Sequence, residues 1–203
     1  MIRIKPYRAS DVDTILSWCQ DEKSFYQWTA GILGNYPITQ KEFCFVESLM
    51  PFTAFDETGI VGFFTLRNPD ESLDELRFGF IIVNPHRRGK GYGKAMLQLG
   101  LKFVFEIYGA KKVSLGVFEN NLPAYYCYKA VGFNDVVLDT TETYCVLGEE
   151  FFLVRIKLLY LSAARCHPSS STNLLSARRF IVSGFPQRGH IGSSSVGIRI
   201  LFC

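Results

Sequence analysis

The sequence predicts an α/β fold in which helices flank a mixed β-sheet. Two observations lead to this prediction. Apolar runs with the composition of strands alternate along the chain with segments whose apolar residues recur at helical spacing. In addition, the run LRFGFIIV at 76–83 is apolar on both faces, which is typical of a central strand that is covered on both sides.

The N-terminal part of the chain predicts one strand and two helices. IRIKPY at 2–7 has the pattern of a short strand. Ser10 is placed to cap a helix that runs to Gln20, with an apolar face made of Val12, Ile15, Leu16 and Cys19. The stretch 24–37 is aromatic and rich in turn residues, and it stays without assignment. Thr39 is expected to cap a second helix over 38–49.

The rest of the chain predicts a hairpin and then alternating strands and helices. Two strand patterns, at 52–56 and 59–67, are joined by a turn at 57–59. After the central strand, a helical pattern extends from Gly91 to Tyr108 and a buried strand follows at 111–118. A helix is expected from Asn121 to Ala130, and strands are expected at 132–138 and 149–158.

The composition excludes several classes of protein. No apolar run approaches the roughly 18 to 20 residues that a membrane-spanning helix needs, and the N-terminus lacks the apolar region of a signal peptide. Six cysteines without C-x-x-C spacing fit free thiols in a reducing compartment. With only three histidines, a multi-histidine metal site is not expected. We therefore expect a cytoplasmic protein with no metal and no membrane association.

The last part of the chain differs in composition from the rest. Of the 22 basic residues, five lie in residues 161–203, which contain no acid, so 17 basic and 19 acidic residues remain in residues 1–160. The body of the protein is therefore mildly acidic, and no basic face indicates nucleic acid. The final segment is also rich in serine and lacks a sustained apolar period. We predict one domain over 1–158 and a Ser/Arg-rich tail over 159–203, which is either disordered or a non-native extension of the reading frame.

A basic, glycine-rich loop follows the central strand. IIVNPHRRGKGYGKAM at 81–96 places three glycines and several cations between a strand and a helix. Unpaired backbone N–H groups and the helix dipole make such a helix start an anion site, and glycine allows close approach of the ligand. Two nucleotide motifs do not fit: Walker A fails because its last position would be Ala95, and the dinucleotide fingerprint fails because its last glycine would be Lys94.

The motif that does fit is R-x-x-G-x-G, formed by Arg88, Gly91 and Gly93. Here the sequence resembles the GCN5-related N-acetyltransferase (GNAT) superfamily, whose R/Q-x-x-G-x-G/A loop holds the pyrophosphate of acetyl-coenzyme A. A second segment, NNLPAYYCYKAVGF at 120–133, is similar to the family's N-x-x-A-x-x-x-Y-x-x-x-G-F passage. The two motifs occur in the family's order and are separated, as in the family, by one helix and one strand. The resemblance covers about residues 1–158 and implies an α+β fold with a mostly antiparallel, splayed sheet.

The resemblance implies a set of residues that bind acetyl-CoA. The end of the central strand is expected to pair with the pantetheine arm, and a backbone N–H near Ile82 is expected to polarise the thioester carbonyl. The glycine loop is expected to bind the pyrophosphate, and Asn121 is either a helix cap alone or also a contact of the cofactor. The complete set of expected cofactor residues is Ile81, Ile82, Val83, Arg88, Gly89, Lys90, Gly91, Tyr92, Gly93, Lys94 and Asn121. For Arg87 and Lys94, contact with the ligand and contact with water both stay open.

Two residues are candidates for the chemistry. By position in the second motif, Tyr128 resembles the family's general acid, which donates a proton to the departing thiolate. A packing role is the ordinary alternative for a tyrosine on an amphipathic helix. The family often uses a carboxylate near the start of the central strand to take the proton of the amine. Glu75 is the candidate here, with Asp74 beside it and a solvated strand end as the alternative.

The implied reaction is direct transfer of an acetyl group from acetyl-CoA to a primary amine while both are bound. The segments 25–28 and 139–150 are expected to form the acceptor slot, and the acids Asp139, Glu142, Glu149 and Glu150 would favour a cationic acceptor. The general layout resembles the branch that acetylates N-termini of ribosomal proteins and its small-amine relatives. The acceptor is therefore a small-molecule amine or a protein N-terminus, and a homodimer is one expected assembly because dimers are common in the family. The alternative function is a non-catalytic acyl-CoA-binding sensor or scaffold.

Overall fold

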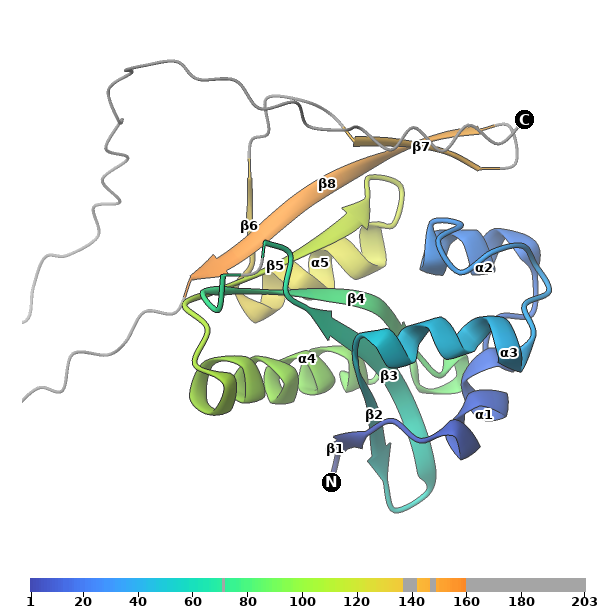
Figure 1. Ribbon diagram of the computed structural model, residues 1–203, viewed down its shortest axis with the longest axis horizontal. Coiled ribbons are helices and arrows are strands. Elements are labelled where there is room, and N and C mark those ends of the chain that lie inside the picture. The colour runs from blue at the N-terminus through green and yellow to red at the C-terminus, as the bar shows by residue number, and fades with distance from the viewer. Residues whose placement is uncertain (71, 137–141, 147–148, 160–203) are drawn as a thin grey trace, which may run out of the picture. The chain divides into compact units, whose positions relative to one another are not determined.

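A computed structural model describes residues 1–70, 72–136, 142–146 and 149–159, and these form one mixed sheet with helices on both faces (Figure 1). The hydrogen-bonded strand order is β1-β2-β3-β4-β5-β8-β6, and β7 pairs with β8. The strands are β1 (Arg3–Pro6), β2 (Met50–Asp56), β3 (Gly59–Arg67), β4 (Glu75–Val83), β5 (Lys112–Phe118), β6 (Asn134–Asp135), β7 (Glu142–Val146) and β8 (Glu149–Leu159). All pairs are antiparallel except β4 with β5, so the expected mixed, mostly antiparallel sheet is confirmed.

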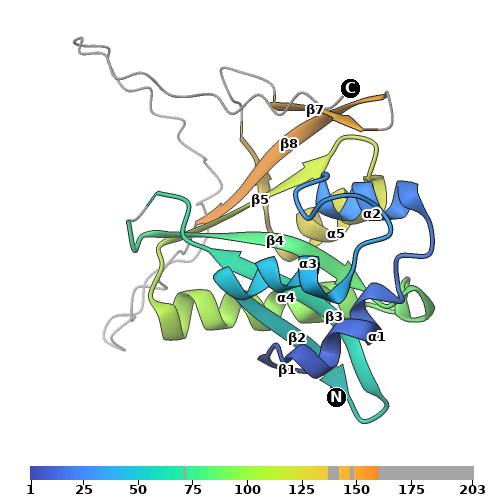
Figure 2. The ribbon, with the colours of Figure 1, turned by 45° about the vertical axis from the view of Figure 1, so that its right-hand side comes forward.

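The helices form two layers, one on each face of the sheet (Figure 2). They are η1 (Ala9–Asp11), α1 (Val12–Leu16), α2 (Glu22–Thr29), α3 (Gln40–Phe43), η2 (Cys44–Ser48), η3 (Pro85–Arg87), α4 (Tyr92–Lys102), the π-helical turn η4 (Phe103–Tyr108) and α5 (Leu122–Val131). Helices α4 and α5 pack on one face through Met96, Leu97 and Tyr128. Helices α1 to α3 cover part of the other face around Phe63 and Ile82. No helix of the described residues is long and apolar enough to cross a membrane.

The sheet opens between its two parallel strands. β4 and β5 are paired only over Glu75–Arg77 and Lys112–Ser114. Beyond that point β4 remains paired with β3, and β5 remains paired with β8 along its full length. The C-terminal half of β4 and the end of β5 therefore separate, which is the splay that the family resemblance implies.

A β-bulge lies in β4 beside the splay. Phe63 pairs with Ile82 and Thr65 pairs with Gly79, so β4 has one more residue than β3 between these pairs. Phe80 takes up the extra length with a φ of 46°. A positive φ is uncommon for a bulky residue and costs of order 1–3 kcal/mol. The rest of the strand holds this conformation at the edge of the opening.

Several local predictions need correction. Ser10 is not a helix cap: Ala9–Asp11 forms a 3-10 turn and the following α-helix ends at Leu16, before the expected Gln20. The carboxylate of Asp11 accepts a hydrogen bond from the backbone N–H of Arg8, and this stabilises the tighter turn. The unassigned stretch 24–37 contains most of α2, which is capped by Asp21.

Other local predictions hold in full or in part, and the helix expected over 38–49 is α3 followed by the 3-10 helix η2. Thr39 caps α3, as expected, through a hydrogen bond from the backbone N–H of Glu42. Within 132–138 only Asn134–Asp135 is a strand, and residues 137–138 lie outside the described residues. The tail prediction over 159–203 likewise lies outside the described residues, apart from Leu159 at the end of β8.

Candidate active site

A cavity of about 1020 Å³ occupies the splay between β4 and β5. Its walls come from the second half of β4, the end of β5, the N-terminal turns of α4 and α5, and parts of α2, β3, β7 and β8. Segments that are far apart in the sequence, from Cys19 to Arg155, therefore meet around one space. Its size lies in the upper part of the range of small-molecule and cofactor sites.

The glycine loop forms one end of the cavity. Gly89 and Gly91 have φ values of 72° and 81°, and the helix α4 begins directly after Gly91. Ala95 donates the first backbone hydrogen bond of the helix to Gly91, so the N–H groups of the preceding turn have no partner within the helix. The left-handed glycines turn the chain sharply into the helix, which leaves these N–H groups available to an anion.

Two basic residues of the loop line the cavity, and two others make contacts outside its wall. Arg88 and Lys94 line the cavity, and Arg88 Nε donates to the carbonyl of Val83 at 3.2 Å. Lys90 donates to the carbonyl of His86 at 3.2 Å and is exposed beside the cavity rather than in its wall. Arg87 donates to Thr58 and lies over the ring of Tyr92, on the side of the β2–β3 hairpin.

Tyr92 connects the loop to the hairpin. Its hydroxyl donates to Asp56 at 2.8 Å, and Asp56 also accepts hydrogen bonds from the hydroxyl and the backbone N–H of Thr58. These hydrogen bonds, the Thr58 hydroxyl first, lower the pKa of Asp56 to about 2. Asp56 is therefore ionised at neutral pH and holds the first turn of α4 against β2 and β3.

The end of β4 presents backbone groups to the cavity. Ile81, Ile82 and Val83 all line it. Because the described pairing of β4 with β5 stops at Arg77, the β5-facing N–H and C=O groups beyond that point have no partner in the sheet. An extended ligand can pair with them as an additional strand would.

Tyr128 lies in the wall of the same cavity, on α5. It is 7 % exposed, and its hydroxyl has no hydrogen-bond partner among the described residues. Burial, and to a lesser degree the neighbouring Cys127, raises the pKa of Tyr128 far above its ordinary value of 10.0. The hydroxyl therefore stays protonated at neutral pH. Burial also raises the pKa of the Cys127 thiol, which argues against a nucleophilic thiolate.

The sequence left open whether Asn121 only caps a helix or also contacts the cofactor, and its position in the structure allows both. Its side chain accepts a hydrogen bond from the backbone N–H of Ala124 at 3.4 Å and so caps α5. Asn121 also lines the cavity. Capping and contact with a ligand are therefore compatible at this position.

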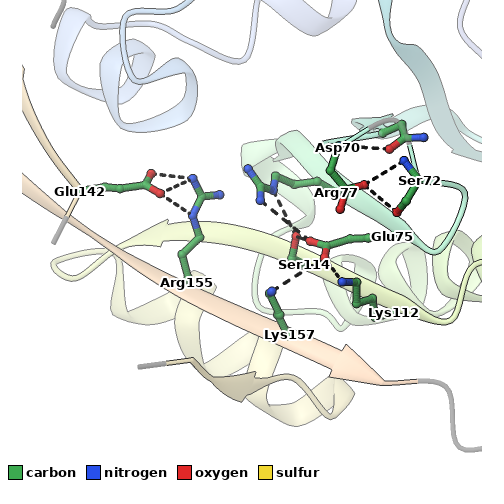
Figure 3. A network of polar contacts seen from close by, with 10 residues as sticks. Asp70, Ser72, Glu75, Arg77, Lys112, Ser114, Glu142, Arg155 and Lys157 are labelled. Carbon is green, nitrogen blue, oxygen red and sulfur yellow. Dashed lines mark hydrogen bonds and ion pairs between the residues drawn. The ribbon is translucent and has the colours of Figure 1, made fainter. Parts of the chain in front are cut away.

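Glu75 is not brought together with Tyr128. It is 3 % exposed, does not line the cavity, and lies at the paired start of β4 (Figure 3). Ser114 donates to it at 2.5 Å, while Lys112 and Lys157 lie 3.1 and 3.8 Å away. Burial raises the pKa of Glu75, but the Ser114 hydrogen bond and the two lysines outweigh it, and the pKa lies below its ordinary value. The geometry therefore indicates a structural ion-pair centre instead of a base at the reacting atoms.

The acids of the expected acceptor slot do not reach the cavity where the structure describes their side chains. None of the aspartates and glutamates of the described residues lines the cavity. Glu142 is bound by Arg155 through hydrogen bonds from Nε and Nη2 (Figure 3), Glu150 lies away from the cavity, and Asp139 lies outside the described residues. Of the expected segments, Gln27, Trp28 and Tyr144 do reach the cavity wall.

Three arginines that sequence reasoning did not single out line the cavity instead: Arg67, Arg77 and Arg155. Arg67 ends the largely apolar strand GIVGFFTLR, Arg77 lies within the apolar run LRFGFIIV, and Arg155 follows the apolar residues FFLV in EEFFLVRIKL. A charged residue inside or at the end of a buried strand is the signal that could have indicated them.

The fold combines a mostly antiparallel, splayed sheet with a cavity that has a glycine loop at one end. A family model described as "Acetyltransferase (GNAT) family" matches residues 14–133. The chain therefore belongs to the GNAT acetyltransferase family, and the resemblance seen in its two motifs is confirmed.

Individual relatives are similar over a shorter stretch. A "Probable spermine N(1)-acetyltransferase" of Bacillus subtilis subsp. natto is 31% identical over 88 residues, which are 41% of this chain and 58% of that protein. An "N-alpha-acetyltransferase" of Sulfurisphaera tokodaii is 36% identical over 78 residues, or 38% of this chain and 46% of that protein. The chain thus spans less than two thirds of the length of these curated relatives.

Solved structures support the fold. The crystal structure of a spermidine N-acetyltransferase from Vibrio cholerae in complex with CoA and spermine matches with a TM-score of 0.66 at 17% identity. The match covers 78% of this chain and 95% of that one. At this identity the likeness shows the shared GNAT fold.

Proposed function

We propose that the protein is an acetyl-CoA-dependent N-acetyltransferase that moves an acetyl group to a primary amine by direct attack within a ternary complex. The observation that carries this proposal is the continuity of the cavity. One space extends from the glycine loop, past the unpaired edge of β4, to Tyr128. A donor with a pyrophosphate at one end and a thioester at the other would occupy this path.

Each part of the cavity has a role in this proposal. Backbone N–H groups of Gly89, Gly91 and Gly93 bind the pyrophosphate, and Arg88 and Lys94 add positive charge. Tyr92 holds the loop in place, Lys90 contributes charge from outside the wall, and Asn121 contacts the donor from the start of α5. The edge formed by Ile81, Ile82 and Val83 pairs with the pantetheine arm.

The chemistry follows from charge and protonation. The amine nitrogen attacks the thioester carbonyl, a backbone N–H near Ile82 stabilises the developing oxyanion, and the C–S bond breaks. Tyr128, which is protonated at neutral pH, donates its proton to the leaving thiolate and then regains a proton from water in the cavity. Glu75 is enclosed by its own ion pairs, so we do not assign it as the base, and the proton of the amine passes to water in the cavity.

Homology offers candidates for the acceptor. The matched relatives are named for spermine, spermidine and N-terminal α-amino groups. These names favour polyamines as the first acceptors to test and make the ribosomal-protein branch the less favoured assignment. All of them are primary amines, as the proposed reaction requires.

Calorimetric titration of acetyl-CoA into the full chain tests the proposal. We expect saturable binding with a Kd in the micromolar range that free CoA competes away. Absence of binding to the folded protein would refute the proposal. Binding without transfer to any amine of a broad panel would instead favour a non-catalytic acyl-CoA-binding module.

A further inference from the structure

A cluster of arginines lies at the end of the cavity that is remote from the glycine loop. Arg67 and Arg77 are directly opposite each other in the β3–β4 register, so their side chains share one face of the sheet. Arg77 pairs with Ser114 across β4 and β5, and Arg155 pairs with Gly116 across β5 and β8, which places Arg155 on the same face. All three arginines line the cavity.

The positive charge of this cluster is only partly balanced. Arg155 is paired with Glu142 at 2.5 Å. Arg77 donates to the hydroxyl of Ser114 and lies 3.9 Å from Glu75, a carboxylate that two lysines already hold (Figure 3). The side chain of Arg67, which is exposed, has neither a hydrogen bond nor an ion pair within the described part of the chain. The cluster therefore has guanidinium N–H groups without a partner among the described residues, and these groups can bind an anion.

The arginines also repel one another. Burial first, and then the charges of Arg155 and Arg67, lowers the pKa of the Arg77 guanidinium. Like charges directly opposite each other on neighbouring strands are destabilising. An anion placed between them would offset this repulsion and gain charge-assisted hydrogen bonds, and a guanidinium group can hold a carboxylate through two parallel N–H donors.

The phosphates of the donor are not the anion that this cluster fits. The stretch of β4 from Arg77 to Val83 is about 20 Å long at roughly 3.3 Å per residue. The glycine loop follows Val83, so the arginines and the pyrophosphate site lie at opposite ends of the cavity. The reacting end of the donor lies between them, beside Tyr128, and the arginine end is left for the acceptor.

We propose that the acceptor is a small amine that also bears a carboxylate, and that Arg67 and Arg77 bind this carboxylate while the amine attacks the thioester. This inference rests on the proposed function and names its substrate class. A polyamine carries only positive charge and meets a cavity wall with arginines and, in the residues described, no carboxylate. Electrostatic repulsion then disfavours the acceptors that the names of the relatives suggest.

Matched pairs of amines test the inference with the full chain and acetyl-CoA. Glycine, 4-aminobutyrate and 6-aminohexanoate are compared with ethylamine, n-butylamine and n-hexylamine, in which a methyl group replaces the carboxylate. Spermidine, spermine and a glycyl peptide amide without a carboxylate complete the panel. We expect kcat/KM for at least one carboxylate to exceed that of its alkylamine and of both polyamines by tenfold or more. The preferred chain length would measure the distance between the arginines and the thioester.

Variants at Arg67 show whether the arginines cause this preference. Because Arg67 is exposed and makes no described contact that the fold needs, Arg67→Gln is expected to fold normally. We expect this variant to lower, by about tenfold, the ratio of kcat/KM for the carboxylate-bearing amine to kcat/KM for its alkylamine. The change should come chiefly from KM of the acceptor, with KM of acetyl-CoA unchanged. Arg67→Glu is expected to shift the preference towards the polyamines. Arg3→Gln is the matched control, because Arg3 is an exposed arginine outside the cavity, and it is expected to change none of these values.

The possible results separate the two proposals. The carboxylate inference is overturned if alkylamines or polyamines are acetylated with the same kcat/KM as the best carboxylate-bearing amine. It is also overturned if Arg67→Gln leaves the ratio of these kcat/KM values unchanged. In both cases the acetyltransferase function stands. If acetyl-CoA binds and no amine of the panel is acetylated, the proposed function fails and this inference fails with it.

Discussion

At the scale of single residues, burial and partners decide what Tyr128 and Glu75 can do. Both are almost fully buried and both can titrate. Tyr128 lies in the cavity wall without a partner for its hydroxyl among the described residues, and burial first, then Cys127, raises its pKa further above neutral pH, so the hydroxyl is protonated and able to donate. Glu75 is surrounded by donors and cations that keep it ionised and occupied. We therefore propose Tyr128 for the chemistry and a structural role for Glu75.

Replacing Tyr128 with phenylalanine removes the proposed acid with little change in volume. We expect kcat to fall by a factor on the order of 10² to 10⁴, as for loss of a general acid, with acetyl-CoA affinity nearly unchanged. Steady-state kinetics and calorimetry on the same preparation measure the two effects. Tyr125→Phe is the control, because the Tyr125 hydroxyl binds Asp135 outside the cavity. Unchanged turnover in Tyr128→Phe would remove Tyr128 from the mechanism.

The pH dependence of kcat offers an independent test of Tyr128. An acid must stay protonated to work, and burial raises the pKa of Tyr128 far above 10.0. We therefore expect no descending limb in the profile of kcat around pH 10 over the range in which the protein stays folded. A descending limb below pH 10 that is lost in Tyr128→Phe would show that the hydroxyl is not shielded in this way.

Glu75→Gln tests the structural role of Glu75. The substitution leaves Lys112 and Lys157 without their counter-charge, and we expect the free energy of unfolding at pH 7 to fall by about 1–3 kcal/mol. Because the folded-state pKa of Glu75 lies below 4.5, its contribution is present above pH 4.5 and is lost as the pH falls through the lowered value. Denaturant unfolding of both proteins between pH 3 and pH 7 measures this, and the difference should shrink on acidification. A changed pH–rate profile with unchanged stability would instead support Glu75 as the base.

At the scale of elements, the strand–loop–helix unit of β4, the glycine loop and α4 was predictable because its determinants are local. Apolar pattern, glycine spacing and cations all lie within one stretch of the sequence, and the structure places helix α4 directly after Gly91. The early helix was misplaced because Asp11, rather than Ser10, supplies the local hydrogen bond. β7 was missed because it is only five residues long and becomes a strand through its pairing with β8.

Gly91→Ala tests the glycine loop. A β-carbon at Gly91 meets no neighbouring atom, but its φ of 81° is unfavourable for alanine by about 1–2 kcal/mol. We expect that loss of stability together with a roughly tenfold weaker affinity for acetyl-CoA, equivalent to about 1.4 kcal/mol. Gly109→Ala is a close control, since Gly109 has a φ of 85° and equally open surroundings outside the cavity. If both variants bind acetyl-CoA like the wild type, the loop is only a helix entry.

At the scale of the whole molecule, the sequence predicted the type of sheet, the splay and the glycine loop at one end of the cavity, but not the arginines at the other end. The acids of 139–150 suggested a cationic acceptor, yet Glu142 is neutralised by Arg155, a residue that only the β7–β8 hairpin brings near it. Arg67 and Arg77 become one cluster only through the β3–β4 register. Which charges neutralise or face one another depends on the pairing of strands that are distant in the sequence. A local sequence pattern does not show this pairing.

We also propose that the functional domain ends at about residue 158. The described strand pairing ends at Leu159, and residues 1–160 form one compact unit by their own contacts. We expect a variant that ends at Tyr160 to keep its affinity for acetyl-CoA and to change its free energy of unfolding by less than about 1 kcal/mol. Calorimetric titration and denaturant unfolding of both chain lengths measure this. Loss of folding or of binding on truncation would show that 161–203 belong to the domain.

The central claim is that the protein transfers an acetyl group from acetyl-CoA to an amine that is bound in the cavity. Product analysis tests this claim most directly. The full chain is incubated with acetyl-CoA and the amine panel described above, and acetylated amine and free CoA are both quantified by mass spectrometry. We expect one acetylated amine for each CoA released, with both products greatly reduced for Tyr128→Phe. Saturable binding of acetyl-CoA with no acetylated amine, or with release of CoA by hydrolysis alone, would contradict the account and leave a binding module in its place.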